Sequence, residues 1–175
     1  MPGVPIFADT MEETSEFTEI PATTRDYHPA DAAALACIYR AAILQTAGSV
    51  YSPAQCAAWA DAANDTAAWE KRLQDAWVRV ACTDDGEIVG FGGILLPGHI
   101  DLLFTAPEFN RQGVGSLILD DLLELGAAMG ARQLTVDASE LSRGFFEKHG
   151  FKLLGSGTHS RGEQTLSCHH LAYGK

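Results

Sequence analysis

Residues 106–119 read APEFNRQGVGSLIL, and this stretch decides how the chain is interpreted. It follows an apolar run, residues 100–104, which is typical of a buried strand. Pro107 lacks the N–H that a continuing strand needs, and Gly113 and Gly115 interrupt the turn that follows. Apolar residues then return at spacings of three and four, as on one side of a helix. The stretch predicts a strand, a glycine-containing turn and a helix.

A turn of this kind has the properties of an anion-binding loop. The first N–H groups of a helix have no partner inside it, and the macrodipole adds roughly half a positive charge at that end. Glycine has no Cβ, so the backbone can lie directly against a ligand. We therefore expect main-chain donors here to hold a phosphate or pyrophosphate. The spacing fits neither the nucleotide P-loop nor the G-x-G-x-x-G dinucleotide fingerprint.

Residues 110–115, NRQGVG, resemble the acetyl-CoA loop of the GCN5-related N-acetyltransferases (GNAT), written [Q/R]-x-x-G-x-[G/A]. Asn110 departs from that pattern, because Gln or Arg is usual at the first position. Main-chain amides make most of the pyrophosphate contacts in the family, so the departure is mild.

A second resemblance lies downstream, where residues 139–151 read SELSRGFFEKHGF. This segment is similar to the family's N-x-x-A-x-x-F-Y-E-x-x-G-F element. Ser139 and Ser142 stand at its Asn and Ala positions, and Phe146 stands at its Tyr position. The two elements occur in the family's order, and the resemblance is firm over residues 77–155.

The resemblance implies an α/β fold: one GNAT-type domain over residues 20–175, preceded by a loose tail over residues 1–19. Its central sheet would be mostly antiparallel, with a splayed parallel pair and flanking helices. The residue pattern agrees, since residues 77–105 predict an antiparallel meander and residues 99–137 predict a strand–helix–strand crossover. After Gly150 two further strands follow, near residues 151–154 and 165–172.

Helices are predicted before and after this sheet. Pro29 suits the first turn of one helix, and Ser52 followed by Pro53 is typical of the start of a second. A third helical segment holds Trp69 and Leu73. Residues 139–149 predict the last helix, with Gly150 as its C-terminal glycine.

The resemblance also assigns residues to acetyl-CoA. The pantetheine arm would pair with the main chain of Leu103 and Thr105, in the manner of an added strand. The remaining predicted contacts are in the loop and in the downstream element: Asn110, Arg111, Gln112, Gly113, Val114, Gly115, Ser116, Ser139, Ser142 and Phe146.

Catalysis requires a proton acceptor for the attacking amine and a proton donor for the leaving thiolate. Asp101 is the first candidate for the acceptor, because an acid inside an apolar strand is unlikely to serve core packing. In relatives a carboxylate on this strand acts as base, directly or through water. His99 lies on the same face of the strand and can extend a proton path.

The proton donor is less defined, because Phe146 has no hydroxyl where many relatives use a tyrosine. We take Tyr51 and His149 as catalytic candidates, with Tyr39, Tyr173 and solvent as alternatives. Residues 51–59 resemble a segment found in a bacterial subgroup of acetyltransferases. Packing for Tyr51 and helix capping for His149 remain open as their roles.

The composition of the chain disfavours several classes of binding partner. The formal net charge of −11 disfavours nucleic acid, whose phosphates would be repelled. No apolar run approaches the ~20 residues of a membrane helix, and the first residues carry acids but no basic residue, unlike a signal peptide. The four scattered cysteines favour reduced thiols in the cytoplasm and no metal site. Homodimers are frequent in the family.

The predicted function is transfer of an acetyl group from acetyl-CoA to a primary amine on a small-molecule or peptide acceptor, by direct attack. A non-catalytic acyl-CoA-binding or regulatory module is the alternative, because of Phe146. The acceptor is left open, since fold alone does not name a substrate.

Overall fold

The structure is a computed structural model that describes residues 19–174. The predicted tail, apart from Glu19, lies outside the described residues. One sheet holds seven strands in the order β1-β2-β3-β4-β5-β7-β6. The strands are β1 (Ala22–Asp26), β2 (Trp77–Thr83), β3 (Ile88–Leu95), β4 (His99–Thr105), β5 (Gln133–Ala138), β6 (Lys152–Arg161) and β7 (Gln164–Gly174).

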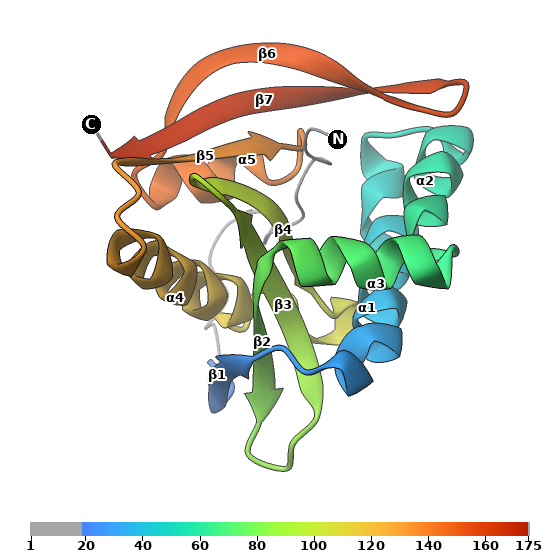
Figure 1. The fold of residues 1–175 in the computed structure, drawn as a ribbon. Coiled ribbons are helices and arrows are strands. Elements are labelled where there is room, and N and C mark those ends of the chain that lie inside the picture. Colours follow the sequence, from blue (N-terminus) through green and yellow to red (C-terminus); the bar gives the residue numbers. More distant parts are fainter. Residues whose placement is uncertain (1–18, 175) are drawn as a thin grey trace.

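Every neighbouring pair in the sheet is antiparallel except β4 and β5, which are parallel. This confirms the predicted mixed sheet with its meander and its one crossover. The helices are α1 (Ala32–Thr46), α2 (Pro53–Ala60), α3 (Thr66–Asp75), α4 (Val114–Ala128) and α5 (Arg143–Lys148). Helices α1, α2 and α3 lie on one side of the sheet, and α4 lies on the other (Figure 1).

Two hydrophobic clusters hold these layers together. The first joins α1, α2 and α3 to the sheet, and at its centre Tyr39 packs on Trp69 and Phe104 with ring centroids 5.0 and 4.7 Å away. The second lies under α4 and α5, where Ile118 and Phe146 are fully buried. The fold therefore has an apolar core on each side of the sheet, and the functional groups described below interrupt it.

Close packing of α4 on β3 depends on glycine. A Cβ built on Gly92 would lie 2.7 Å from Ile118 Cγ2 and 2.8 Å from Leu122 Cδ1. Gly90 is similarly close to Ile118 and Val114. The helix can approach the strand this closely because these positions have no side chain.

The last helix is shorter than the sequence predicts. It begins at Arg143, because residues 139–142 form a turn in which Ser139 and Ser142 exchange hydrogen bonds. Each hydroxyl accepts the main-chain N–H of the other residue, at 3.0 and 3.1 Å, and this pairing competes with the helical pattern. The predicted end is confirmed, since Gly150 has φ +87° and follows the last turn. The capping of α2 by Ser52 and Pro53 is confirmed as well.

We expect Gly92→Ala to destabilise the protein by about 1–3 kcal/mol, because the added methyl overpacks the contact between β3 and α4. Gly155→Ala is the matched control, since Gly155 is also in a strand but a Cβ there meets nothing within 4 Å. Urea unfolding of both variants measures the difference. Equal stability of the two variants would show that α4 does not lie this close to β3.

Candidate functional site

The parallel pair of strands separates soon after it forms. β4 and β5 are in register only at His99 with Thr135 and at Ile100 with Val136. Beyond that point no strand among residues 19–174 pairs with their main-chain groups on this side. The Ala106 N–H donates to Val89 O at 2.9 Å, so alternate residues of β4 face β3 and the main-chain groups of Leu103 and Thr105 face the gap. The gap lies where the sequence predicts the pantetheine arm.

An irregularity in β4 places Asp101 at the start of this gap. Ile94 pairs with Ile100, whereas Gly93, the residue before Ile94 in β3, pairs with Leu102. Asp101 is therefore an extra residue in β4. Such a bulge changes the direction of the side chains that follow it. Asp101 and Leu102 accordingly both face α1 and α3, on the side of the sheet opposite α4.

The predicted anion-binding loop has the expected backbone geometry. Gly113 has φ +83° and precedes α4, and Arg111 has φ +62°. The first main-chain bond inside the helix runs from the Leu117 N–H to Gly113 O, which leaves the N–H groups of Val114, Gly115 and Ser116 without helical partners. A hollow lies beside this loop, lined among others by Glu19, Pro21, Gln112, Gly113, Ser116 and Asp120.

Side chains near the loop support its shape, and the Glu19 side chain lies against Gly113, with its Cγ 3.4 Å from a Cβ built there. Gln112 Nε2 donates to Glu108 O at 2.9 Å, and Gln112 O accepts the Ile20 N–H at 3.3 Å. A Cβ on Gly115 would lie 3.5 Å from the Phe145 ring and 3.8 Å from Thr105 Oγ1. Thr105 Oγ1 is buried without a hydrogen-bond partner among the described residues. The loop and the gap thus meet at Thr105.

The three predicted cofactor contacts in the downstream element are buried. Ser139 and Ser142 have no exposed surface and form the turn before α5. Phe146 is also fully buried, and its ring packs on Phe145 and Phe151 with centroids 5.3 and 5.1 Å away. The structure gives these side chains packing and turn-forming roles, and their contact with acetyl-CoA stays a prediction.

Asp101 is one half of a buried ion pair. Arg72 Nε, from α3, lies 2.7 Å from Asp101 Oδ2, and the two side chains are only 21% and 4% exposed. Burial alone would lower the pKa of Arg72, but Asp101 outweighs it and the pKa is raised. Tyr39 lies against this pair, and burial raises the pKa of its phenol. Asp101 therefore acts next to a fixed positive charge.

His99 lies in the same region, and its imidazole is neutral and partly buried. Its Nδ1 is 2.9 Å from Thr135 Oγ1, while Nε2 is buried with no hydrogen-bond partner among the described residues. Burial lowers the pKa of His99 below its ordinary value of 6.5, although Asp137 and Asp101 act in the opposite direction. At neutral pH the ring is uncharged, with one nitrogen free to accept or donate a proton.

Next to His99, Asp137 holds two histidines. His159 Nε2 lies 3.2 Å from Asp137 Oδ2, and His170 Nδ1 bonds Asp137 Oδ1. Burial would raise the pKa of Asp137, but these hydrogen bonds outweigh it and lower the pKa to about 2. His99, Asp101 and this trio form a polar cluster around the gap, and His99 interacts electrostatically with both acids and both histidines.

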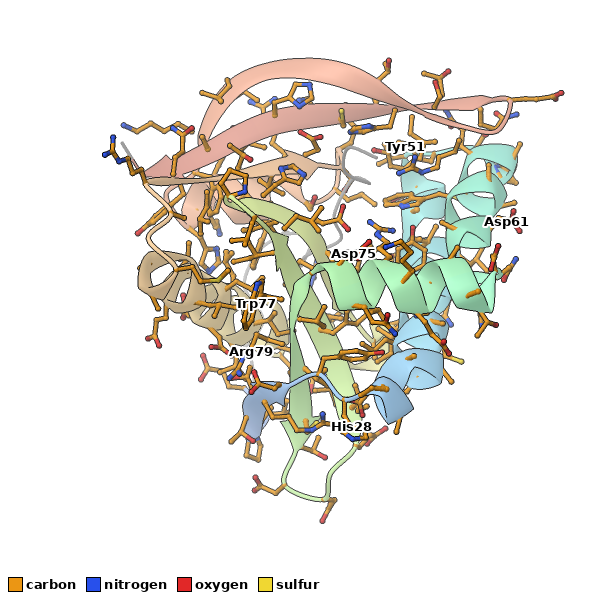
Figure 2. The ribbon with its side chains drawn as sticks, in the orientation of Figure 1. His28, Tyr51, Asp61, Asp75, Trp77 and Arg79 are labelled. Atoms are coloured by element: carbon orange, nitrogen blue, oxygen red, sulfur yellow. The ribbon has the colours of Figure 1, made fainter. Side chains whose placement is uncertain are left out.

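Tyr51 and His149 are on different sides of the sheet. Figure 2 shows Tyr51 beneath β7, where its hydroxyl donates to Ser167 O at 3.0 Å and accepts the Glu140 N–H at 3.1 Å. His149 ends α5, where Nδ1 bonds Phe145 O at 2.8 Å and Nε2 lies 3.1 Å from Ser116 Oγ. Tyr51 is thus close to the end of β5 and the gap, and His149 is close to the predicted pyrophosphate loop.

Sequence reasoning missed five side chains in or beside the polar cluster: Arg72, Asp137, His159, His170 and Arg161. One signal was present in β6, where inward-facing positions alternate and place His159 and Arg161 on the same face. Arg72 had no comparable signal, since its partner Asp101 is distant in the sequence. No group of three metal-binding side chains was found among residues 19–174, and no helix in that range has the length and apolar character to span a membrane.

Comparison with known proteins gives concordant results. Residues 48–166 match the family model described as an acetyltransferase (GNAT) domain. The chain is 38% identical over 128 residues to the "uncharacterized N-acetyltransferase YafP" of Escherichia coli, covering 73% of this chain and 79% of that protein. It is 39% identical over 87 residues to the peptidyl-lysine N-acetyltransferase YjaB of Salmonella typhimurium, covering 47% and 55% of the two chains.

Solved structures extend the match to nearly the whole chain. A GCN5-related N-acetyltransferase from Rhodopseudomonas palustris superimposes with a TM-score of 0.87 at 35% identity, covering 92% of this chain and all (100%) of that one. The PaiA N-acetyltransferase of Thermoplasma acidophilum, solved in complex with coenzyme A, shares the fold with a TM-score of 0.74 at 16% identity, over 89% of this chain and 100% of that chain. Together with the loop and the splayed strands, these matches show that the chain belongs to the GNAT acetyltransferase family.

Proposed function

We propose that this chain transfers the acetyl group of acetyl-CoA to a primary amine. One observation carries the proposal: the gap between β4 and β5 continues into the N–H groups at the start of α4, which have no partner inside the helix. The gap offers main-chain donors and acceptors to an extended amide-containing arm, and the amides offer donors to a pyrophosphate. Coenzyme A presents these two groups in this order.

In this arrangement the main chain of Leu103 and Thr105 pairs with the pantetheine arm. The amides of residues 111–116 bind the pyrophosphate, and Asn110 begins that turn. The acetyl thioester then lies at the narrow end of the gap, near the bulge at Asp101. The acceptor amine approaches from the side of α1 and α3, where Asp101 is buried and His99 is partly buried.

The reaction is an attack of the amine nitrogen on the thioester carbonyl. A C–N bond forms, the C–S bond breaks, one proton leaves the nitrogen and one proton reaches the thiolate. We assign two roles to the residues on this side. Asp101 orients the amine and is the first group to take its proton, and the neutral His99 ring then receives that proton from Asp101. The electrostatic interaction between these two residues supports the path. A positioned acid or base contributes typically about 10²–10⁴-fold.

For protonation of the thiolate, Tyr51 is the stronger of the two candidates. Burial raises the pKa of its phenol, against the opposing effect of the Glu140 N–H, so the hydroxyl is protonated at neutral pH. It also lies at the end of β5, next to the gap. His149 bonds an α5 carbonyl and Ser116, which supports a role in shaping the loop. Solvent remains the alternative donor, since a thiol of pKa ≈ 8.5 leaves readily.

The acceptor class follows from the relatives only in outline. One relative is named a peptidyl-lysine N-acetyltransferase, and another, from Trypanosoma brucei brucei, is named a glucosamine 6-phosphate N-acetyltransferase. Both of these acceptors carry a primary amine. The described cysteines are all free, which supports a reducing, cytoplasmic location. A homodimer stays an expectation from the family alone.

We expect Gly113→Glu to weaken acetyl-CoA binding by about tenfold or more, because the charge and the bulk of the new carboxylate keep the pyrophosphate away from the loop amides. Gly86→Glu is the matched control, since Gly86 has φ +84° against +83° for Gly113 and lies in the hairpin between β2 and β3. Both variants carry the same backbone strain, so calorimetric titration with acetyl-CoA isolates the effect of the loop. Equal affinities for the two variants would contradict the assignment of the loop.

We expect Asp101→Asn to lower kcat by about 10²-fold or more with little change in acetyl-CoA affinity. Asp121→Asn is the control, because Asp121 also pairs with an arginine Nε, at 2.6 Å from Arg79, but on α4 away from the gap. Release of free thiol is followed with an amine panel. A kcat for Asp101→Asn equal to that of the control would remove Asp101 from the mechanism. Binding of acetyl-CoA without turnover of any amine by the unaltered protein would favour a non-catalytic module.

The pH profile tests His99. Only the neutral ring accepts a proton, so kcat/KM falls as pH drops through the pKa of His99, which burial places below 6.5. We expect kcat/KM to reach its plateau towards neutral pH, and to fall by about tenfold per pH unit below the midpoint. His99→Gln should lower the plateau and abolish this acidic limb, while His28→Gln, at an exposed helix start, should retain it. An unchanged limb in His99→Gln would exclude His99 as the group that titrates.

A further inference from the structure

The hairpin of β6 and β7 extends over the acceptor side of the gap. In Figure 1 this hairpin crosses the top of the molecule, and its tip reaches α2. Two contacts hold it there: Gln55 Nε2 donates to Thr165 O at 2.7 Å, and the Tyr51 hydroxyl donates to Ser167 O at 3.0 Å. Leu166, between these carbonyls, belongs to the core of the α1–α3 layer. The tip is therefore a fixed part of the wall of the acceptor site.

The inner face of this hairpin carries Arg161. Along β6 the positions with reduced exposure alternate, and the last of them is Arg161, two residues after His159. The Arg161 guanidinium interacts electrostatically with Tyr39, Arg72 and Asp101, so the inner face of the hairpin lies near the buried pair. Burial lowers its pKa below the ordinary value for an arginine, yet the side chain remains a cation at neutral pH.

The hydrogen bonds of Arg161 are incomplete. Its one side-chain bond among the described residues runs from an Nη1 to Ser160 O, at 3.1 Å, within its own strand. The Arg161 Nε is buried and has no hydrogen-bond partner among residues 19–174. A buried guanidinium donor without an acceptor is unfavourable, and its planar fork fits the two oxygens of a carboxylate or phosphate.

The acids nearby are already paired. Asp101 is held by Arg72, and Asp137 is held by His159 and His170. Among residues 19–174 no carboxylate forms an ion pair with Arg161. The site thus offers an uncompensated positive charge, in a chain whose formal net charge is −11. Such a charge attracts an anion from outside the chain.

We propose that the acceptor is a small amine that also carries an anionic group, carboxylate or phosphate, and that Arg161 binds this group while the amine lies at Asp101. The inference rests on the proposed acetyl transfer and names the substrate class for it. Binding the anion at the hairpin and the amine at β4 fixes the acceptor at two points, which orients the nitrogen towards the thioester. An amine without the anionic group would leave the Arg161 donors unpaired and would bind less well.

The test uses matched acceptors that differ in the anion. One series compares L-phenylalanine with phenethylamine, for a carboxylate. A second series compares glucosamine 6-phosphate with glucosamine, and phosphoethanolamine with ethanolamine, for a phosphate. The full chain is assayed with acetyl-CoA by thiol release, alongside Arg161→Gln, Arg161→Glu and the control Arg132→Gln, whose side chain is exposed beyond the far end of the sheet.

We expect kcat/KM for the anionic member of at least one series to exceed that of its neutral partner by about 10-fold to 100-fold. Arg161→Gln should abolish most of that preference while changing the neutral acceptors by less than about threefold, and Arg161→Glu should reverse it. The control should keep the preference. The series that shows the effect distinguishes a carboxylate from a phosphate.

Equal rates for anionic and neutral partners in both series, or a preference that survives in Arg161→Gln, would overturn the proposal. Calorimetry on protein saturated with coenzyme A separates this failure from failure of the proposed function, because coenzyme A occupies the loop of α4. Binding of the anionic acceptors that depends on Arg161, without any acetyl transfer, would keep the site and exclude the reaction. Absence of binding by every anionic acceptor would reject the site itself.

Discussion

The structure depends on the point at which β4 and β5 stop pairing. Two strands of one sheet normally satisfy each other's main-chain groups along their whole shared length, and buried groups left without partners are costly. Here the register ends after Ile100 and Val136, and the bulge at Asp101 redirects β4. Among residues 19–174 no strand pairs with the β4 and β5 groups that face each other beyond this point, and a partner of extended shape would satisfy them. A pantetheine arm has that shape. Binding of the cofactor would therefore offset the free-energy cost of leaving these main-chain groups without partners.

The same separation creates two chemically different compartments. On the side of α4, the gap leads to helix amides and glycine, which suit a phosphate linker. On the side of α1 and α3, it leads to a dense set of titratable groups within an aromatic core. Fully buried aromatic rings such as Tyr39 and Phe104 keep the second compartment rigid. In the proposed reaction, the cofactor and the acceptor meet where the two compartments join, at Asp101.

Local signals in the sequence predicted most of the fold, because they act over a few residues. Proline, glycine and capping side chains indicated the start of α2 and of α4, and apolar runs bounded by turn residues indicated the meander. The short α5 was not predicted, since the mutual bonds of Ser139 and Ser142 compete with a pattern that is helical by its apolar spacing. The predicted cofactor loop could be recognised because its glycine pattern is also a local signal, which acts over a few residues. The acceptor side was not, because Arg72, Asp137 and Arg161 come from three separate elements and are brought together only by the tertiary fold.

Tyr51 connects three parts of the molecule through one phenol. It lies before α2, accepts a hydrogen bond from the turn after β5, and donates one to β7. Gln55, one turn further along, adds a second link to β7. The hairpin and α2 consequently behave as one module: an insertion or exchange in either element alone would break both links at once. Divergence towards new acceptors would then require paired changes in two segments more than a hundred residues apart, |i−j| being 110 and 116 for these two links.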